Sequence, residues 1–212
     1  VYGDNPNKLK FIEKKHRYDI KKNENYFKGI DENMSIDNNV HSFFGVSKSY
    51  SDLLVQEFGK NYGMNTVCFR AGCVTCPAHS GAELHGFLSY LVKISLKKRK
   101  YTLIGYKGKQ VRDNIHSHGL VSCFWEFYKK PKCGEVYNIG GGRVSNCSVI
   151  EALNIVEKSY NFQLKKKYIK IPRVGDHIWY ISNLKKFRNH YPKWKQKYNT
   201  KKILGELIES FS

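Results

Sequence analysis

The sequence predicts an α/β fold built on a parallel sheet. Short apolar runs typical of buried strands occur at residues 66–69, 101–104, 136–139 and 168–171. Segments with apolar residues at helical spacing separate these runs, and strands that alternate with helices are typical of parallel sheets. With 212 residues, 41% of them hydrophobic, the chain is long enough to bury a sizeable core.

The helix that is most clearly marked in the sequence begins near Ser42 and ends at Gly63, a typical helix stop. Because its apolar residues recur at helical spacing, we expect a buried amphipathic helix. These residues are Val46, Tyr50, Leu53, Leu54, Phe58 and Tyr62. Further helices are expected at 84–96, 120–128, 148–160, 184–190 and 202–210.

The segment from residue 5 to residue 40 is polar and irregular. It contains Asn5-Pro6-Asn7, Gly29 and several further Asp and Asn residues, which favour turns. We therefore expect a long loop rather than a core element. Loops of this length inside a domain are usually functional or disordered.

The formal net charge of +19 would ordinarily suggest a polyanionic partner. The lysines are scattered, however, and the runs at 97–100 and 165–167 lie beside predicted helix ends, where cations suit the helix dipole. No nucleic-acid recognition motif accompanies them. We therefore do not expect nucleic acid as a partner, and we assign the positive charge a smaller role in attracting a diphosphate substrate.

The sequence lacks an apolar run of roughly 18 to 20 residues and a signal-peptide layout, so it predicts a cytoplasmic protein without a membrane partner. Its first residue, Val1, suggests a fragment. The six cysteines are expected to be reduced thiols. Cys73 and Cys76 have the spacing of a redox or zinc pair, but no second pair completes a metal site, and two small buried residues at a strand end are expected instead.

Three linked stretches resemble a known family. They are Val1-Tyr2-Gly3-Asp4 with Phe44-Gly45-Val46-Ser47-Lys48, then 108–116 with 134–141, then Arg173-Val174-Gly175-Asp176 with 191–194. Their order and spacing resemble the second half of extended short-chain dehydrogenases/reductases, the group of NAD-dependent nucleotide-sugar epimerases and dehydratases. The segments 79–87, 105–110 and 173–177 are similar to the CDP-paratose (CDP-tyvelose) 2-epimerase branch of that family.

The resemblance implies the C-terminal part of a Rossmann domain, which binds NAD, and a smaller α/β domain that binds the nucleotide sugar. Residues 1–80 would belong to the Rossmann domain and 81–212 mainly to the substrate domain, with 109–145 returning to the Rossmann domain. The glycine-rich phosphate loop of Rossmann folds is absent from this sequence, because Gly140-Gly141-Gly142 lacks its spacing. Members of the family commonly pair through helices, so a homodimer is expected.

The family's chemistry implies a tyrosine that takes a hydroxyl proton, four residues before a lysine that also binds the nicotinamide ribose. Lys48 matches the lysine, but the tyrosine position holds Phe44, which has no ionisable proton. Another group would then have to serve as the base. The candidates near in sequence are His41, Ser42, Cys73 and His79.

The resemblance also implies a set of ligand-binding residues. Arg112 and Arg173 would hold the substrate pyrophosphate, since a guanidinium donates to two phosphate oxygens at once. Asp176 would bind the ribose or the sugar. The alternative for the two arginines, for Asp176 and for Asp113 is that they form Arg–Asp ion pairs on the surface. Gly72 would contact the cofactor, and the remaining substrate-binding candidates are Cys73, Glu83, Leu84, His85, Tyr101 and Gln110. His116 is expected to be a core histidine.

The function that the resemblance implies is NAD-dependent epimerisation at C2 of a CDP-linked deoxyhexose. The sugar would be oxidised transiently to a keto intermediate and then reduced on its opposite face. Two alternatives remain open. The first is a nucleotide-sugar 4,6-dehydratase, and the second is a nucleotide-sugar-binding module that has lost catalysis, since Phe44, Cys76 and Gly119 depart from the family pattern.

Overall fold

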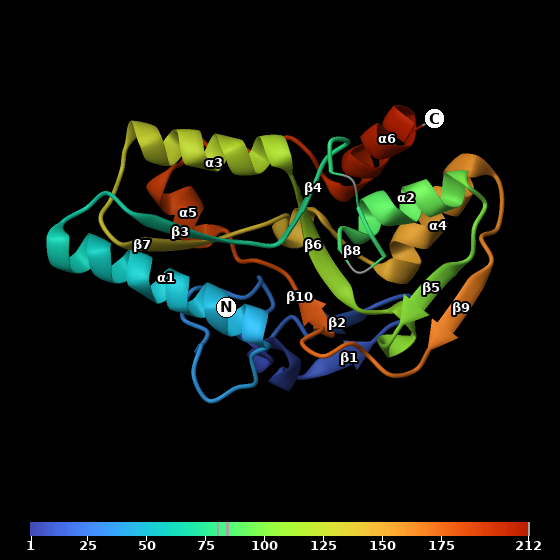
Figure 1. The fold of residues 1–212 in the computed structure, drawn as a ribbon, viewed down its shortest axis with the longest axis horizontal. Coiled ribbons are helices and arrows are strands. Elements are labelled where there is room, and N and C mark those ends of the chain that lie inside the picture. Colours follow the sequence, from blue (N-terminus) through green and yellow to red (C-terminus); the bar gives the residue numbers. More distant parts are fainter. Residues whose placement is uncertain (80, 84, 212) are drawn as a thin grey trace.

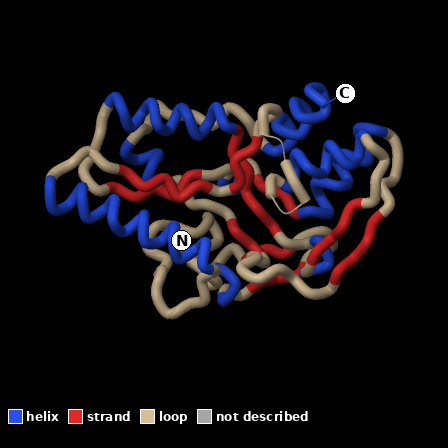
Figure 2. The backbone as a smooth tube through the Cα atoms, viewed as in Figure 1, coloured by secondary structure: helices blue, strands red, loops and turns tan. Residues whose placement is uncertain are grey.

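The computed structural model describes residues 1–79, 81–83 and 85–211 and confirms the α/β class (Figures 1 and 2). Every helix expected from the sequence is present, with ends that differ by a few residues. Two helices begin where the sequence places a serine cap. The side-chain oxygens of Ser42 and Ser148 accept hydrogen bonds from the first turns of these helices. The α-helices are α1 (Phe43–Tyr62), α2 (Phe87–Leu96), α3 (Ser117–Lys129), α4 (Val149–Tyr160), α5 (Lys185–His190) and α6 (Thr200–Phe211).

The strands form several short sheets, most of them with parallel pairing. β3 pairs with β7, β5 pairs with β9, and β6 lies between β4 and β10, all in parallel, whereas β8 joins β6 in antiparallel orientation. The strands are β1 (Phe11–Glu13), β2 (Tyr18–Ile20), β3 (Val67–Ala71), β4 (Cys73–Thr75), β5 (Tyr101–Ile104), β6 (Val111–His116), β7 (Glu135–Ile139), β8 (Asn146–Ser148), β9 (Lys166–Ile169) and β10 (Trp179–Tyr180).

The described residues form three hydrophobic core clusters. One joins α2, α4 and α6 to β5, and a second joins β6 and β7 to α3 and α5. In Figure 1 the pair β3–β7 lies between α1 and α3, while α2, α4 and α6 gather at the other end of the molecule. The third cluster packs Tyr2, Ile20 and Ile30 against Trp179 and neighbouring residues.

The prediction of a loop without core residues at 5–40 was wrong. The segment contains the antiparallel hairpin β1–β2, and Ile20, Ile30 and Met34 are buried in the third cluster. Ile30 also forms backbone hydrogen bonds with Ile181 and Asn183, so the segment is attached to the residues that follow β10. Isolated apolar residues without a period of two or 3.6 gave no signal for these contacts.

The prediction that α1 is buried was also wrong. Its apolar residues Tyr50, Leu53 and Phe58 are 66%, 48% and 44% exposed. The face turned to β3 and β7 instead carries Asp52 and Gly59, which are the buried residues of the helix. The apolar face of α1 is therefore available for contact with another molecule or segment.

Asp113 is not a surface ion pair, contrary to the alternative reading of the sequence. Its carboxylate is buried and accepts backbone N–H groups from Gly142 at 3.0 Å and from Ser182 at 2.9 Å. A Cβ atom at Gly72 or Gly140 would lie 2.4 or 2.2 Å from the same carboxylate. Asp113 thus connects β6 to the turn after β7 and to the segment after β10, and burial raises its pKa to about 6.

Gly59→Ala is expected to destabilise the fold, because a Cβ at residue 59 would lie 2.2 Å from the backbone nitrogen of Gly134. Overpacking against rigid backbone costs about 1–3 kcal/mol. The matched control is Gly205→Ala in α6, where nothing lies within 4 Å and a gain of up to about 1 kcal/mol is expected. Urea unfolding measures both, and equal effects of the two variants would contradict this packing.

Asp113→Asn tests the protonation of the buried carboxyl. Since its pKa is raised from 3.8 to about 6, the folded state binds more protons than the unfolded state in this range, and Asp113's contribution to stability falls as the pH rises from 4 to 6. The difference in free energy of unfolding between wild type and variant should shift by roughly 2 kcal/mol over that range. The exposed Asp37→Asn is the control, and pH-independent differences for both variants would refute the assignment.

Candidate functional site

One large cavity, of about 1070 Å³, contains almost all of the predicted site residues that the structure describes. Its walls come from α1, β3, β4, the segment before α2, β5, β6 and residues 173–180. The volume matches the upper range of small-molecule sites. The predicted residues that line it are Lys48, Gly72, Cys73, Glu83, His85, Tyr101, Gln110, Arg112, Arg173 and Asp176.

The helix α1 brings Lys48 to the cavity but leaves Phe44 outside. Lys48, Asp52 and Val55 line the cavity at helical spacing. Phe44 is 71% exposed, is not one of the lining residues, and has its ring centroid 5.3 Å from the Lys48 ammonium nitrogen. The side chain at the tyrosine position therefore contributes no proton-transfer group to the cavity.

A buried ion pair forms part of this wall. Arg70 donates two hydrogen bonds to Asp52, at 2.7 and 2.9 Å, and a third to the Tyr2 hydroxyl at 2.9 Å. The Tyr2 hydroxyl in turn donates to Asn138 at 2.8 Å. The chain of contacts fixes α1 relative to β3 and β7. The sequence analysis missed Asp52, although its position four residues after Lys48 places both on one face of the helix.

The two predicted phosphate-binding arginines meet at Asp176. The Asp176 carboxylate accepts a hydrogen bond from Arg112, and its other oxygen lies 3.9 Å from a guanidinium nitrogen of Arg173. The Asp176 side chain is only 7% exposed, whereas that of Arg173 is 42% exposed. The ion pairs that the sequence left as an alternative are present, but they lie in the cavity wall and offer two guanidinium groups to an anion.

Gly72, between β3 and β4, and Cys73, the first residue of β4, line the cavity, and Gly72 packs against Asp113. Gly72 admits no side chain, because a Cβ there would meet the Asp113 carboxylate. Cys73 and Cys76 are partly exposed in the cavity rather than buried, which corrects the prediction, and all six cysteines are free thiols. Burial raises the pKa of the Cys73 thiol to about 11, so it is protonated at neutral pH.

Within residues 1–79, 81–83 and 85–211, no group of three or more His, Cys, Asp or Glu could hold a metal ion. Cys73 and Cys76 therefore have no third ligand in the part of the chain that the structure describes.

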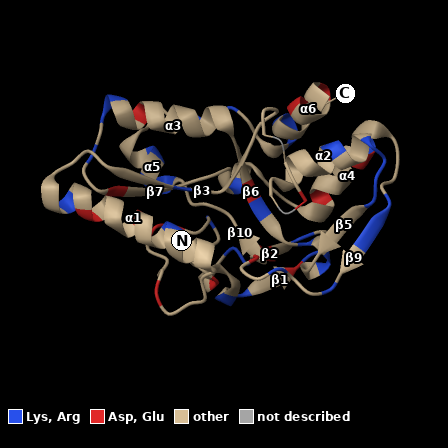
Figure 3. Cartoon of the chain, viewed as in Figure 1, with Lys and Arg blue, Asp and Glu red and all other residues tan. Residues whose placement is uncertain are grey.

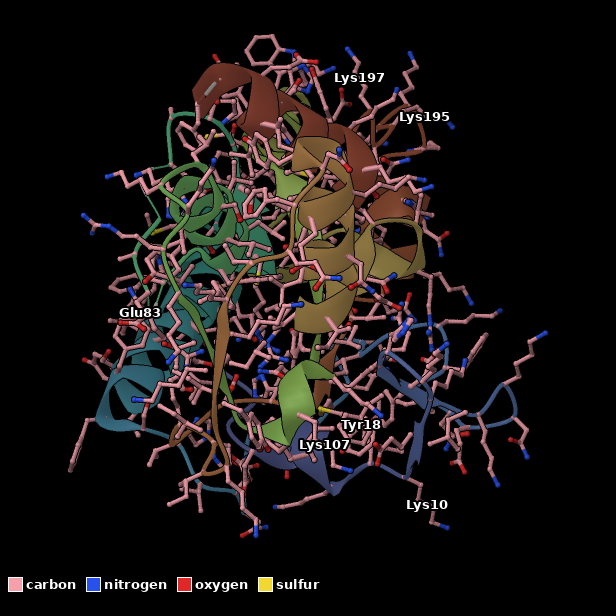
Figure 4. All side chains as sticks on the ribbon, turned by 90° about the vertical axis from the view of Figure 1, so that its right-hand side faces the viewer. Lys10, Tyr18, Glu83, Lys107, Lys195 and Lys197 are labelled. Atoms are coloured by element: carbon pink, nitrogen blue, oxygen red, sulfur yellow. The ribbon has the colours of Figure 1, made fainter. Side chains whose placement is uncertain are left out.

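The segment before α2 contributes His79, Glu83 and His85 to the cavity. The rings of His79 and His85 meet edge to face, with centroids 5.5 Å apart. Glu83 and His85 are exposed, and Figure 4 shows Glu83 at the surface. The predicted site residue Leu84 lies outside the described residues.

Tyr101 and Gln110 lie at the end of the cavity formed by β5 and β6. Tyr101 is 5% exposed and belongs to the first core cluster, so it serves the core as well as the cavity wall. Gln110 donates to the carbonyl oxygen of Ile104 at 3.0 Å. Its buried side-chain oxygen has no hydrogen-bond partner among the described residues.

His177 is a cavity residue that the sequence analysis did not single out, although it directly follows Asp176. Its Nε2 lies 2.8 Å from the carbonyl oxygen of Gly3, and its ring stacks on Tyr180 with centroids 5.5 Å apart. Burial and the charge of Arg112 lower its pKa to about 4, so the ring is neutral at pH 7. A neutral ring can donate to Gly3 only from Nε2, which fixes the tautomer.

Other sequence candidates take structural roles. His41 lies 3.0 Å from the carbonyl oxygen of Ile36, and Ser42 caps α1, and neither is among the described cavity residues. His116 is partly buried against Tyr198 and lies 2.9 Å from a Glu206 oxygen. Gly140 and Gly141 are packed against neighbouring atoms and do not form an open phosphate loop.

The basic side chains are distributed over several elements, among them α1, β6, β9 and α6 (Figure 3). Lys195 and Lys197 lie at one end of the molecule and Lys10 and Lys107 at the other (Figure 4). No helix in the described part of the chain is long and apolar enough to cross a membrane.

Comparison with known proteins agrees with this geometry. The model of the NAD dependent epimerase/dehydratase family matches residues 21–140. CDP-paratose 2-epimerase of Salmonella typhi is 26% identical over 216 residues, which cover 99% of this chain and 61% of that protein. dTDP-glucose 4,6-dehydratase 1 of Escherichia coli (strain K12) is 26% identical over 129 residues, covering 57% of this chain and 35% of that protein. The chain thus spans less than two thirds of the length of these relatives.

Solved structures show the same fold. UDP-glucose 4-epimerase of Thermus thermophilus, in complex with NAD, superposes with a TM-score of 0.75 at 18% identity and covers 100% of this chain and 60% of that one. dTDP-glucose 4,6-dehydratase of Bacillus anthracis, also with NAD, gives 0.74 at 21% identity, covering 100% and 58%. The family match over more than half of the sequence and the shared fold lead to one conclusion: the chain belongs to the NAD-dependent epimerase/dehydratase family.

Proposed function

We propose that the protein epimerises a CDP-linked deoxyhexose at C2 through a transient keto sugar. The observation that carries this proposal is that Lys48 and the group of Arg112, Arg173 and Asp176 line one continuous cavity. One wall thus suits a cofactor and the other suits a diphosphate. The similarity to a CDP-paratose 2-epimerase over 99% of the chain supports the choice of nucleotide and sugar.

NAD is the cofactor of this family, and the residues at one end of the cavity fit it. Lys48 projects an ammonium group that can donate to ribose hydroxyls, and Gly72 exposes backbone without a side chain to the cavity. NAD would accept a hydride from the sugar and return it within the same cycle. Lys48 and Gly72 would hold the nicotinamide half of the cofactor.

The arginines at the other end fit the substrate diphosphate. A phosphate oxygen can replace the Asp176 carboxylate as the acceptor for Arg112, since both are anionic oxygens. Asp176 would then be available to accept hydrogen bonds from hydroxyl groups of the ribose or the sugar. Cys73, Glu83, Leu84, His85, Tyr101 and Gln110 would contact the rest of the substrate.

A 4,6-dehydratase is the second candidate, because dTDP-glucose 4,6-dehydratases also match 57% of the chain. Product mass discriminates the two reactions, since epimerisation leaves the mass unchanged and dehydration removes one water. Net release of NADH with an oxidised sugar would instead indicate a dehydrogenase. Absence of turnover together with binding would favour a catalytically inactive binding module.

The division into residues 1–80 and 81–212, with 109–145 returning to the first domain, stays a prediction, as does the cytoplasmic location. We also propose that the protein forms a homodimer through α1. The exposed side chains Tyr50, Leu53 and Phe58 recur on one face of this helix. A second copy of the same face would cover them symmetrically.

Arg173→Met should weaken binding of CDP about 10- to 100-fold, because a charge-assisted hydrogen bond to phosphate contributes roughly 1.5–3 kcal/mol. Binding of cytidine, which lacks phosphate, should not change. Isothermal titration calorimetry on the full-length protein measures both ligands. Lys100→Met is the control, as it removes the same charge from an exposed position outside the cavity. Equal loss of CDP and cytidine binding would argue against a phosphate contact.

Tyr50→Glu should convert the dimer to monomer in sedimentation velocity experiments, because two copies of the helix would bring the added charges together in an apolar interface. Val121→Glu on α3, where Val121 is 60% exposed, should leave the dimer intact. A wild-type protein that is monomeric at tens of micromolar would refute the dimer.

A further inference from the structure

The proposed reaction needs a group that takes a proton from the sugar hydroxyl, and Phe44 cannot supply it. Most of the ionisable groups that line the cavity are engaged. Asp52 is ion-paired with Arg70, and Asp176 is paired with Arg112. Asp113 accepts hydrogen bonds from Gly142 and Ser182 through Oδ2, and its Oδ1, which has no hydrogen-bond partner among the described residues, is buried against Gly72. These carboxylates already accept hydrogen bonds that hold the cavity walls together.

The thiols and phenols in the cavity do not serve better. Burial raises the pKa values of Cys68 and Cys73 to about 11, so both thiols keep their protons at neutral pH. Burial raises the pKa values of Tyr2, Tyr101 and Tyr180 as well. A group that is protonated at rest cannot accept the hydroxyl proton.

Three imidazoles and the carboxylate of Glu83 remain in the described lining. His177 donates from Nε2 to the carbonyl oxygen of Gly3, and burial lowers its pKa to about 4, which makes its other nitrogen a weak proton acceptor, while Glu83 and His85 are exposed to solvent. His79 differs from all three, since its Nδ1 is buried and has no hydrogen-bond partner among the described residues. A neutral imidazole has a nitrogen lone pair that can accept a proton.

The position of His79 also suits the task. It follows the carboxyl end of β4, a strand that pairs in parallel with β6. Ligands of α/β proteins bind outside the carboxyl ends of such parallel strands. Gly86 leaves space for the ring: a Cβ there would lie 2.1 Å from Cε1 of His79. The φ of Gly86 is +71°, which also favours glycine. The lack of a side chain at residue 86 thus sets where the imidazole lies.

We propose that His79 is the proton acceptor of the oxidation step, a role that rests on the proposed function. The sugar C–H bond breaks and its electron pair leaves as hydride to NAD, while the O–H proton passes to the imidazole lone pair and the C=O bond forms. The sugar loses two electrons and NAD gains them. In the return step the hydride goes back to carbon and the imidazolium returns the proton to oxygen.

The test compares His79→Gln and His79→Ala with wild type on the full-length protein with NAD bound and a CDP-deoxyhexose as substrate. Loss of a general base should lower kcat at least ~100-fold, with KM and the calorimetric affinity for the CDP-sugar changed less than about threefold. The acidic limb of the pH profile, along which the rate falls because the base becomes protonated, should vanish in His79→Gln. Added imidazole should restore part of the activity of His79→Ala. His16→Gln, an exposed histidine outside the cavity, is the control.

A readout independent of turnover is the ¹⁵N NMR signal of the His79 ring, which should shift when the CDP-sugar binds but not with CDP alone. An unchanged kcat and pH profile in His79→Gln, or a raised KM at unchanged kcat, would overturn the role of His79 while leaving the proposed function in place. A wild-type protein that binds and converts no nucleotide sugar would overturn both. Gly86→Ala should lower kcat in the same way as His79→Gln, without loss of CDP affinity.

Discussion

The buried carboxylate of Asp113 is the interaction on which the arrangement of the cavity depends. One side chain accepts N–H groups from two segments that are far apart in sequence, at Gly142 and Ser182, and it packs against Gly72 at the cavity wall. It therefore adds to the strand pairing that joins β6 to β8 and to β10. Removing a carboxylate from water is unfavourable, and here hydrogen bonds from backbone amides offset only part of that cost, since burial still raises the pKa of Asp113 to about 6.

Local periodicity was enough to predict most helices and the strands at 101–104 and 136–139, because these elements carry their own apolar pattern and caps. Two features were not predictable in this way. The burial of Ile20 and Ile30 depends on contacts with Trp179 and Ile181, which lie more than 140 residues away. The apolar residues at helical spacing correctly predict the helix α1. Their spacing does not show what covers the apolar face of that helix.

For the site, the sequence motifs predicted residue types, and the fold determined how they are paired. The resemblance assigned Arg112, Arg173 and Asp176 to one ligand, and the structure places them in contact. It gave no sign that His177 would donate to Gly3, or that Asp52 and Arg70 would form the wall behind Lys48, since both depend on long-range contacts. The sequence offers both His41 and His79 as candidate bases. Only the fold distinguishes them, because His79 lines the cavity and His41 does not.

The close approach of Gly59 to Gly134 has a consequence for how the chain can vary. Backbone meets backbone there, so α1 cannot slide or rotate against β7 without a steric clash. Lys48 lies about three turns earlier on the same rigid helix. An insertion or deletion of one residue between 48 and 59 would rotate Lys48 by about 100° away from the cavity while Gly59 stayed in place. Length changes are therefore excluded from this stretch, whereas its exposed side chains are free to change.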